Sequence, residues 1–281
     1  MKILMSLLAW LPLRVLRVGA AIFGVLAYLL LHHRRKITRV NLSLAFARES
    51  TWRRELRCIQ HFVALAQSLA DRAWIWRGSQ ASIKSRITLQ GLEILPRNRN
   101  IVLLAPHMVG VDAAWTRLAI EGLPLTGLYQ PQRHPKKDAL IRSCRLRRGN
   151  VRCYSRHAGI RNILNDFKDG RMFYCLPDMD FGPKDALFVP LFGQQAATLT
   201  VLPKLARISR ALIIPVITRM TSSGYHITIE PPWQDLDQMP LHTACRRMNA
   251  AVEGWAIEAG AEYLWSHRRY KTRPKDAASL Y

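Results

Sequence analysis

The stretch IVLLAPHMVGVD occupies residues 101–112, where an apolar run leads into a turn that carries an imidazole and a carboxylate. Residues 101–105 are short, apolar and strand-like, and Pro106 disfavours helix for the residue before it. We therefore predict that His107 lies in a strand-to-helix turn. Asp112 should then stand in the first turn of a helix that extends to about residue 120.

His107 and Asp112 are five positions apart, which would place them about 140° apart on a single helix. The two side chains can therefore pair only if the chain turns between them. An ionised Asp beside a His fixes the ring tautomer and stabilises the imidazolium, so the ring can take a proton from a hydroxyl. This spacing predicts a catalytic pair. The alternative is a loop histidine and an Asp favoured by the helix dipole.

Apolar and β-branched runs alternate with helical patterns along most of the chain. The runs that predict strands are residues 86–90, 101–105, 125–129, 172–176, 211–218 and 225–230. Helical patterns cover residues 36–77, 112–120, 138–148, 159–168 and 198–209, and Gly78 ends the first of these. Such alternation predicts an α/β fold with a mostly parallel central sheet flanked by helices. Ligands in such sheets bind at the carboxyl ends of strands, and His107 directly follows one.

The chain of 281 residues carries 42 Lys and Arg against 19 Asp and Glu, a formal net charge of +23. An anionic partner is expected, and charge alone does not distinguish nucleic acid, an acidic protein or a phosphorylated lipid. The five cysteines form no C-x-x-C pair, so neither a full disulfide framework nor a spaced metal site is predicted. Cys175, inside an apolar run, is expected to fill core space rather than act as a nucleophile.

Residues 1–35 form a hydrophobic segment that we predict to be a membrane anchor or interfacial helix, with residues 36–281 forming the second domain. Residues 18–31 are continuously apolar, and basic residues flank them on both sides. Fourteen residues are fewer than the ~20 that a helix needs to cross hydrocarbon, although Arg17 could snorkel. Spanning and interfacial placements both stay open, and a buried core helix is the remaining alternative.

Two further groups of charged residues suggest a binding site. Asp178 and Asp180 lie in a Pro- and Gly-bounded turn that follows the predicted strand 172–176. These carboxylates could orient a base, bind substrate or hold a metal, or they could simply form the turn. Residues 133–161 hold ten Lys and Arg against one Asp, a composition suited to phosphate or carboxylate recognition, or to a solvated basic face.

Several separated segments resemble the bacterial late acyltransferases of lipid A biosynthesis, the lauroyl/myristoyl family within the lysophospholipid acyltransferase superfamily. The matching segments occur in a consistent order over nearly the whole chain. They are RVNL at 39–42, the H-x4-D run at 107–112, PDMDFG at 177–182, FVPLFG at 188–193 with AAT at 196–198, and WSHRRYKTRP at 265–274.

The resemblance implies a glycerolipid-acyltransferase-like domain on the cytoplasmic face of the bacterial inner membrane. Its donor would be an acyl-carrier-protein thioester, and its acceptor a hydroxyl of an anionic phosphorylated lipid A precursor. His107 would be the general base and Asp112 would hold it. Asp178 or Asp180 would occupy the family's second acidic position and take part in substrate binding, and a functional arginine would be Arg145, Arg147 or Arg148. No metal or cofactor is expected, because attack of a hydroxyl on a thioester needs only a base and oxyanion stabilisation.

One position departs from the family pattern. The most similar members usually carry Glu at the second position of the motif, whereas this chain has Asp112, as in the glycerolipid branch. Transfer to another glycolipid, a glycerolipid or an aminolipid therefore stays open. The alternative from another class is a membrane-tethered nucleic-acid-binding protein, supported by a pI near 10.8. It is disfavoured because no nucleic-acid motif accompanies the charge and the aromatic residues are not interleaved with the arginines.

Overall fold

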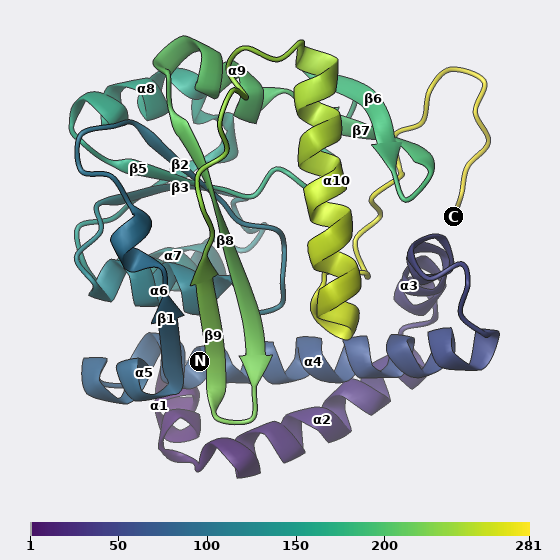
Figure 1. Cartoon of the computed structure of the whole chain (residues 1–281). Helices are drawn as coiled ribbons and strands as arrows, with labels where there is room; N and C mark the ends of the chain where they lie inside the picture. The colour runs from purple at the N-terminus through teal and green to yellow at the C-terminus, as the bar shows by residue number, and fades with distance from the viewer. Residues whose placement is uncertain (1) are drawn as a thin grey trace.

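The computed structural model describes residues 2–281 and gives a sheet with helices on both faces and an additional helical layer at one end (Figure 1). The N-terminal helices are α1 (Lys2–Trp10), α2 (Leu13–Leu30), α3 (His32–Ala45), α4 (Thr51–Arg77) and α5 (Gln80–Arg86). The later helices are α6 (Val111–Ile120), α7 (Pro135–Arg145), α8 (Ile160–Lys168), α9 (Val201–Ser209) and α10 (Leu241–Ala259).

The described residues form a seven-stranded sheet in the order β1-β9-β8-β2-β5-β3-β4. Its strands are β1 (Ile87–Gln90), β2 (Ile101–Leu104), β3 (Leu125–Tyr129), β4 (Arg152–Ser155), β5 (Met172–Cys175), β8 (Leu212–Thr221) and β9 (Gly224–Ile229). All neighbouring pairs are parallel except the β8–β9 hairpin. A separate antiparallel hairpin joins β6 (Ala186–Leu191) to β7 (Gln194–Leu199). The predicted α/β fold with a mostly parallel central sheet is confirmed.

The central strand β2 separates two hydrophobic cores. Because side chains alternate along a strand, Val102 and Leu104 enter the core that also contains α8, α9 and α10. Ile101 and Leu103 enter the other, beneath α6 and the C-terminal half of α4. All four side chains are essentially inaccessible to solvent. The strand is therefore fixed from both faces, and the turn that follows it is held in place.

The predicted elements differ from the observed ones in a few places. The helical pattern of residues 36–77 is interrupted, since α3 ends at Ala45 and α4 begins at Thr51, with the Ser50 side chain accepting the Arg53 N–H. The sequence did not indicate β4, β6, β7 or α10. The boundary predicted at residue 35 falls within α3. That domain division stays a prediction.

Helix α2 packs against α4 (Figure 1). At Gly24 an added Cβ would lie only 2.6 Å from the Val63 Cα, so the two backbones approach closely there. Arg17 of α2 is buried and forms a salt bridge of 2.7 Å with Asp71 of α4, and Asp71 also accepts the hydroxyl of Tyr225 in β9. Among residues 2–281, α2 is the helix long and apolar enough to cross a membrane by length and composition.

Candidate active site

His107 is held by Asp178 through two hydrogen bonds. The ring Nδ1 lies 2.5 Å from Oδ1 of Asp178, and the His107 backbone N–H donates to Oδ2 at 2.8 Å. A carboxylate can only accept, so Nδ1 carries the proton and Nε2 keeps the lone pair. Asp178 is buried while the His107 side chain keeps 19% of its surface exposed. The arrangement presents an oriented imidazole to whatever occupies the site.

The electrostatics of Asp178 favour its ionised form. Burial by itself raises the pKa of this carboxyl. The charge and hydrogen bonds of His107, together with a hydrogen bond from the Tyr263 hydroxyl, outweigh burial and leave the pKa below its ordinary value. Asp178 is thus an anion that can stabilise an imidazolium on His107.

The C-terminal segment runs along the His107 turn and completes the site. Leu264 N–H donates to the His107 carbonyl at 3.0 Å, and Val109 N–H donates to the Glu262 carbonyl at 2.8 Å. Between these two bonds, Met108 and Tyr263 form an isolated antiparallel bridge. Residues more than 150 positions apart in the chain are therefore joined at the site by backbone hydrogen bonds.

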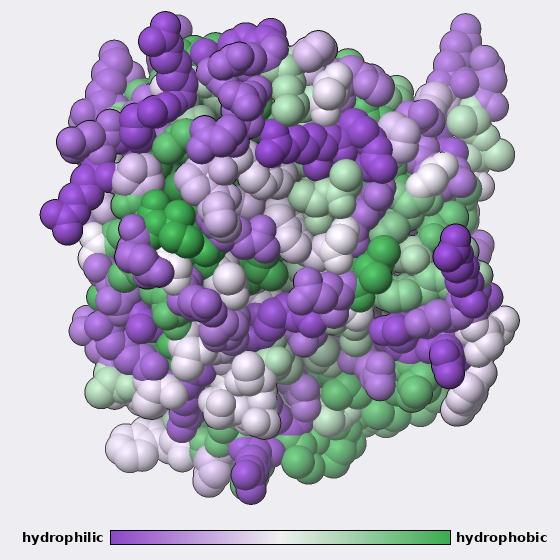
Figure 2. Space-filling model, in the orientation of Figure 1, coloured by the Kyte–Doolittle hydropathy of each residue, from purple (hydrophilic) through white to green (hydrophobic). Residues whose placement is uncertain are grey.

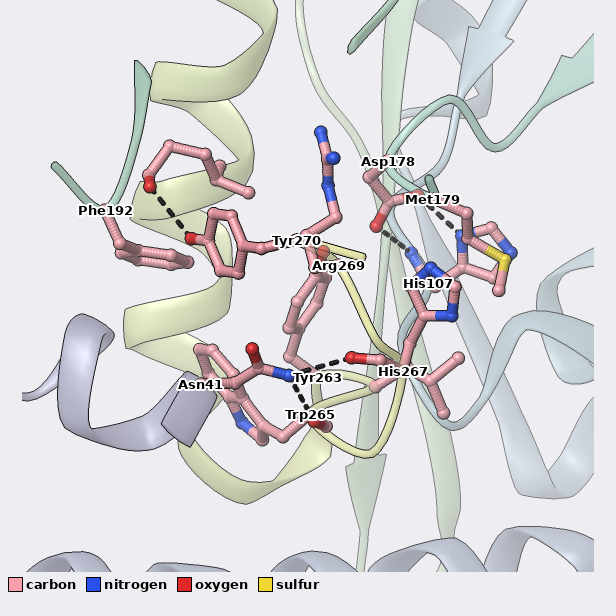
Figure 3. Close-up of a pocket in the computed structure, with 12 residues that line it drawn as sticks. Asn41, His107, Asp178, Met179, Phe192, Tyr263, Trp265, His267, Arg269 and Tyr270 are labelled. Atoms are coloured by element: carbon pink, nitrogen blue, oxygen red, sulfur yellow. Dashed lines mark hydrogen bonds and ion pairs between the residues drawn. The ribbon is translucent and has the colours of Figure 1, made fainter. Parts of the chain in front are cut away.

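A narrow pocket opens beside His107 and Asp178 (Figure 3). Apart from Tyr263 and Leu264, the residues that line it belong to the matching segments: Asn41, His107, Asp178, Met179, Leu191, Phe192, Tyr263, Leu264, Trp265, His267, Arg269 and Tyr270. Asn41 ties α3 to the C-terminal segment, because its amide donates to the carbonyls of Trp265 at 2.7 Å and His267 at 2.8 Å. Most of the lining is aromatic or aliphatic.

Asp112 does not pair with His107, and this prediction was wrong. Its carboxylate forms salt bridges with Arg72 of α4 at 2.7 Å and with Arg145 of α7 at 3.0 Å. The charges of these two arginines outweigh burial and leave the pKa of Asp112 below its ordinary value. Asp112 indeed lies in the first turn of α6, but the helix directs it to the face covered by α4 and α7, whereas His107 meets the turn after β5.

The two carboxylates in the turn after β5 have different roles. Asp178 holds His107, with both of its oxygens engaged, so the structure does not present this carboxylate to a substrate. Asp180 is also buried, and its oxygens accept the N–H of Gly182 and the N–H and hydroxyl of Thr272. Asp180 therefore joins the C-terminal segment to the turn after β5 through hydrogen bonds.

The three candidate arginines lie away from the residues that line the pocket. Arg145 pairs with Asp112. The guanidinium groups of Arg147 and Arg148 donate to the backbone carbonyls of Trp76 and Gly78, at the C-terminal end of α4. These contacts fasten the loop after α7 to α4. Among residues 2–281, no group of three or more His, Cys, Asp or Glu side chains is placed to hold a metal ion.

Comparison with known proteins identifies the family. The sequence profile described as "Bacterial lipid A biosynthesis acyltransferase" matches residues 1–272. The chain belongs to this family. It is an acyltransferase, and the resemblance of the separated segments is thereby confirmed.

Individual relatives cover most of this acyltransferase. A lipid A biosynthesis acyltransferase of Haemophilus influenzae is 32% identical over 88% of this chain and 78% of its own length. The lipid A biosynthesis myristoyltransferase of Escherichia coli is 31% identical over 85% and 76%, and the lauroyltransferase of the same organism 30% over 95% and 88%. A solved structure, the 1-acyl-sn-glycerophosphate acyltransferase of Thermotoga maritima, aligns with 92% of this chain and 97% of its own at a TM-score of 0.40 and 15% identity.

The sequence placed Asp178 among the candidate site residues, with orientation of a base as one possible role, but it did not assign that role and did not single out several other residues of the site. Nothing in the local pattern assigns Asp178, rather than Asp112, to His107, because the pairing depends on two strands that are distant in sequence but adjacent in the sheet. Tyr263 carries no motif signal of its own. Asn41 and His267 lie in segments that resemble the family, and the order of those segments was the available indication that they belong to one site.

Proposed function

We propose that this acyltransferase moves a fatty acyl chain from an acyl-carrier-protein thioester to a hydroxyl of a phosphorylated lipid A precursor, with His107 as the general base. The observation that carries the proposal is the pairing of His107 Nδ1 with buried Asp178 at the mouth of a largely apolar pocket. That pairing leaves Nε2 as the acceptor, and none of the hydrogen bonds among the described residues uses it.

The reaction requires one proton to move twice. Nε2 of His107 takes the proton of the acceptor hydroxyl while the oxygen attacks the thioester carbonyl carbon. The resulting tetrahedral intermediate collapses as the C–S bond breaks and the ester forms. The imidazolium, stabilised by Asp178, then returns the proton to the departing thiolate. No covalent acyl-enzyme is needed, and the proton count balances.

Charge supports the choice of donor and acceptor. A carrier protein is acidic and a lipid A precursor carries phosphates, so both would be attracted to a chain with a formal net charge of +23. The relatives named as lipid A acyltransferases support the acceptor class. Asp112 stands where members of the family usually carry Glu, but its carboxylate pairs with Arg72 and Arg145 and not with His107. The Asp at this position therefore does not favour a different acceptor.

Purified protein in detergent would test this function directly. We expect acyl transfer from an acyl-carrier-protein thioester to a phosphorylated glucosamine disaccharide lipid, detected as a mass increase of the lipid by one acyl chain. Lysophosphatidic acid in the same assay serves as the glycerolipid comparison. Transfer to lysophosphatidic acid alone, or an absence of transfer to either lipid, would contradict the proposal.

We propose further that the protein binds the cytoplasmic face of the inner membrane through α1 and α2 lying in the plane of the interface. Figure 2 shows part of an apolar patch, at the lower right edge of the molecule over α2. Its residues are exposed on the side away from α4, Phe23 and Leu30 by 70% or more. They are Val15, Val18, Ile22, Phe23, Val25, Leu26, Leu29, Leu30 and Leu31, with Ile3, Leu7, Trp10 and Leu11 on and after α1.

The contacts of α2 argue against a spanning orientation. The buried pair Arg17–Asp71 and the close approach at Gly24 fix α2 against α4. Because α4 carries many charged side chains, a spanning α2 would draw them into hydrocarbon at high cost. Exposed Arg14, Arg34 and Lys36 lie near the two ends of α2, where they can contact anionic headgroups. An apolar face with basic flanks is typical of an interfacial helix.

Substitutions on the exposed face should weaken membrane binding. We expect the triple variant Ile22→Ser, Phe23→Ser, Leu30→Ser to bind anionic phospholipid vesicles at least about ten-fold more weakly, because each lost apolar side chain removes about 1 kcal/mol of transfer free energy. Vesicle sedimentation measures this. Ile208→Ser with Ile257→Ser, also exposed but on α9 and α10, is the matched control. Unchanged binding of the triple variant, or retention of the wild-type protein in membranes washed with alkaline carbonate, would contradict in-plane binding.

A further inference from the structure

His267 lies in the pocket beside His107, and the mechanism above does not use it. Both imidazoles line the same pocket (Figure 3), and the electrostatic interaction with His107 is one cause that lowers the pKa of His267. The Nε2 of His267 lies 3.1 Å from the backbone nitrogen of Asp180. A backbone N–H can only donate, so Nε2 must be the unprotonated nitrogen. The proton of a neutral His267 is therefore on Nδ1.

The ring of His267 is neutral at physiological pH. Burial, with the charges of His107 and Arg269, lowers its pKa to about 4. It therefore does not compete with His107 for the proton of the acceptor. A neutral imidazole with a fixed tautomer offers one N–H donor without adding a positive charge next to the base.

A second buried histidine shows what a structural imidazole looks like in this chain. His61 is also neutral, since burial lowers its pKa to about 4. Its Nδ1 contacts the Ala261 carbonyl at 2.9 Å and its Nε2 accepts the Ser266 N–H at 3.2 Å, so both nitrogens are used to hold the C-terminal segment. In His267 only Nε2 is used; no hydrogen bond among residues 2–281 involves Nδ1. His267 thus retains an uncommitted donor at the pocket.

We propose that the Nδ1–H of His267 donates a hydrogen bond to the oxyanion that forms when the acceptor oxygen attacks the thioester. This inference rests on the proposed function and adds a second catalytic residue to it. The tetrahedral intermediate carries its negative charge on the former carbonyl oxygen, which must lie within reach of both the nucleophile and a donor. His107 and His267 both line the same pocket, so the base and the uncommitted donor can act on one bound thioester. The Asp180 N–H holds the ring so that this donor keeps its position.

Two conservative variants separate donation from a structural role. The side-chain amide of Asn reaches the position of Nδ1, so His267→Asn can still donate but loses the acceptor for Asp180. The amide of Gln reaches the position of Nε2, so His267→Gln keeps that acceptor but loses the donor. We expect kcat to fall about 100- to 1,000-fold in His267→Gln, as for loss of an oxyanion donor, and by less than about ten-fold in His267→Asn, with KM little changed in both.

The inference is overturned if His267→Gln keeps near-wild-type kcat, or if the Asn variant is impaired as much as the Gln variant. A purely structural role predicts the reverse order. Nitrogen-15 NMR of the wild-type protein provides a readout that does not depend on activity, the His267 signal being assigned by its loss in His267→Gln. We expect a neutral ring protonated on Nδ1, and protonation on Nε2 would contradict the inference. The proposed function is tested separately, because it fails if the wild-type protein itself transfers no acyl chain.

Discussion

We expect His107→Ala to lower the kcat of acyl transfer about 100- to 10,000-fold. This is the range that a positioned general base contributes. Nε2 of His107 is the acceptor that the Asp178 contact leaves at the pocket. Acyl transfer measured by mass spectrometry on purified protein tests the expectation. The backbone N–H of residue 107 still donates to Asp178 in the Ala variant, so the fold should be kept, and membrane binding should be unchanged because the residue lies outside α1 and α2.

A second histidine provides the control for this substitution. His242 lies exposed on α10, outside the residues that line the pocket, and His242→Ala should keep wild-type transfer. Circular dichroism and vesicle binding of both variants establish that each is folded and attached to lipid. If folded His107→Ala transferred acyl chains at a rate near that of the wild type, the assignment of His107 as the base would be wrong.

Asp178→Asn should cause a loss of comparable size. An amide can still accept one hydrogen bond from His107, but it no longer carries the charge that stabilises the imidazolium, and it can reverse the ring tautomer. Replacing a buried Asp that orients a catalytic His by Asn costs about 10,000-fold in the serine proteases, and we expect a loss approaching this size. Steady-state kinetics of the purified variant measures it.

Asp112→Asn is the matched comparison, because the sequence predicted Asp112, and not Asp178, as the acid that pairs with His107. The structure predicts a different result for it. Loss of the Asp112 charge leaves Arg72 and Arg145 without their partner, so the free energy of unfolding should fall by about 2–4 kcal/mol. Denaturant unfolding measures this. The folded fraction should keep more activity than Asp178→Asn. If Asp112→Asn instead lost more activity per folded molecule, the assignment of the His107 partner would be overturned.

Strands with strong local signals were predicted from the sequence to within a few residues. Residues 125–129 form β3 as predicted, and the first three of them are buried where the strand lies between β5 and β4. The strand β4 was missed because it lies at the edge of the sheet and carries polar residues within the basic region. Edge position is a property of the sheet, so the local composition of β4 does not reveal it.

The long helical pattern of residues 36–77 shows a related difficulty. The sequence predicted one continuous helical pattern across residues 46–50, yet α3 and α4 are separate helices. Ser50 caps α4 through its side chain, a short-range signal that could have indicated the break. Asn41 lies on α3, and its amide donates to the carbonyls of residues 265 and 267, contacts that no local pattern predicts.

The sequence alone determined the α/β class, the place of His107 after a buried strand, and the family, because strand and helix periodicities are local and the family segments keep their order along the chain. Tertiary structure decided which acid holds the base. His107 and Asp178 both follow strands, β2 and β5, that are parallel neighbours in the sheet, so their carboxyl ends meet although 71 positions separate them. Asp112, only five positions from His107, is turned by α6 toward two arginines. Proximity across a sheet depends on strand order, which spacing along the chain does not encode.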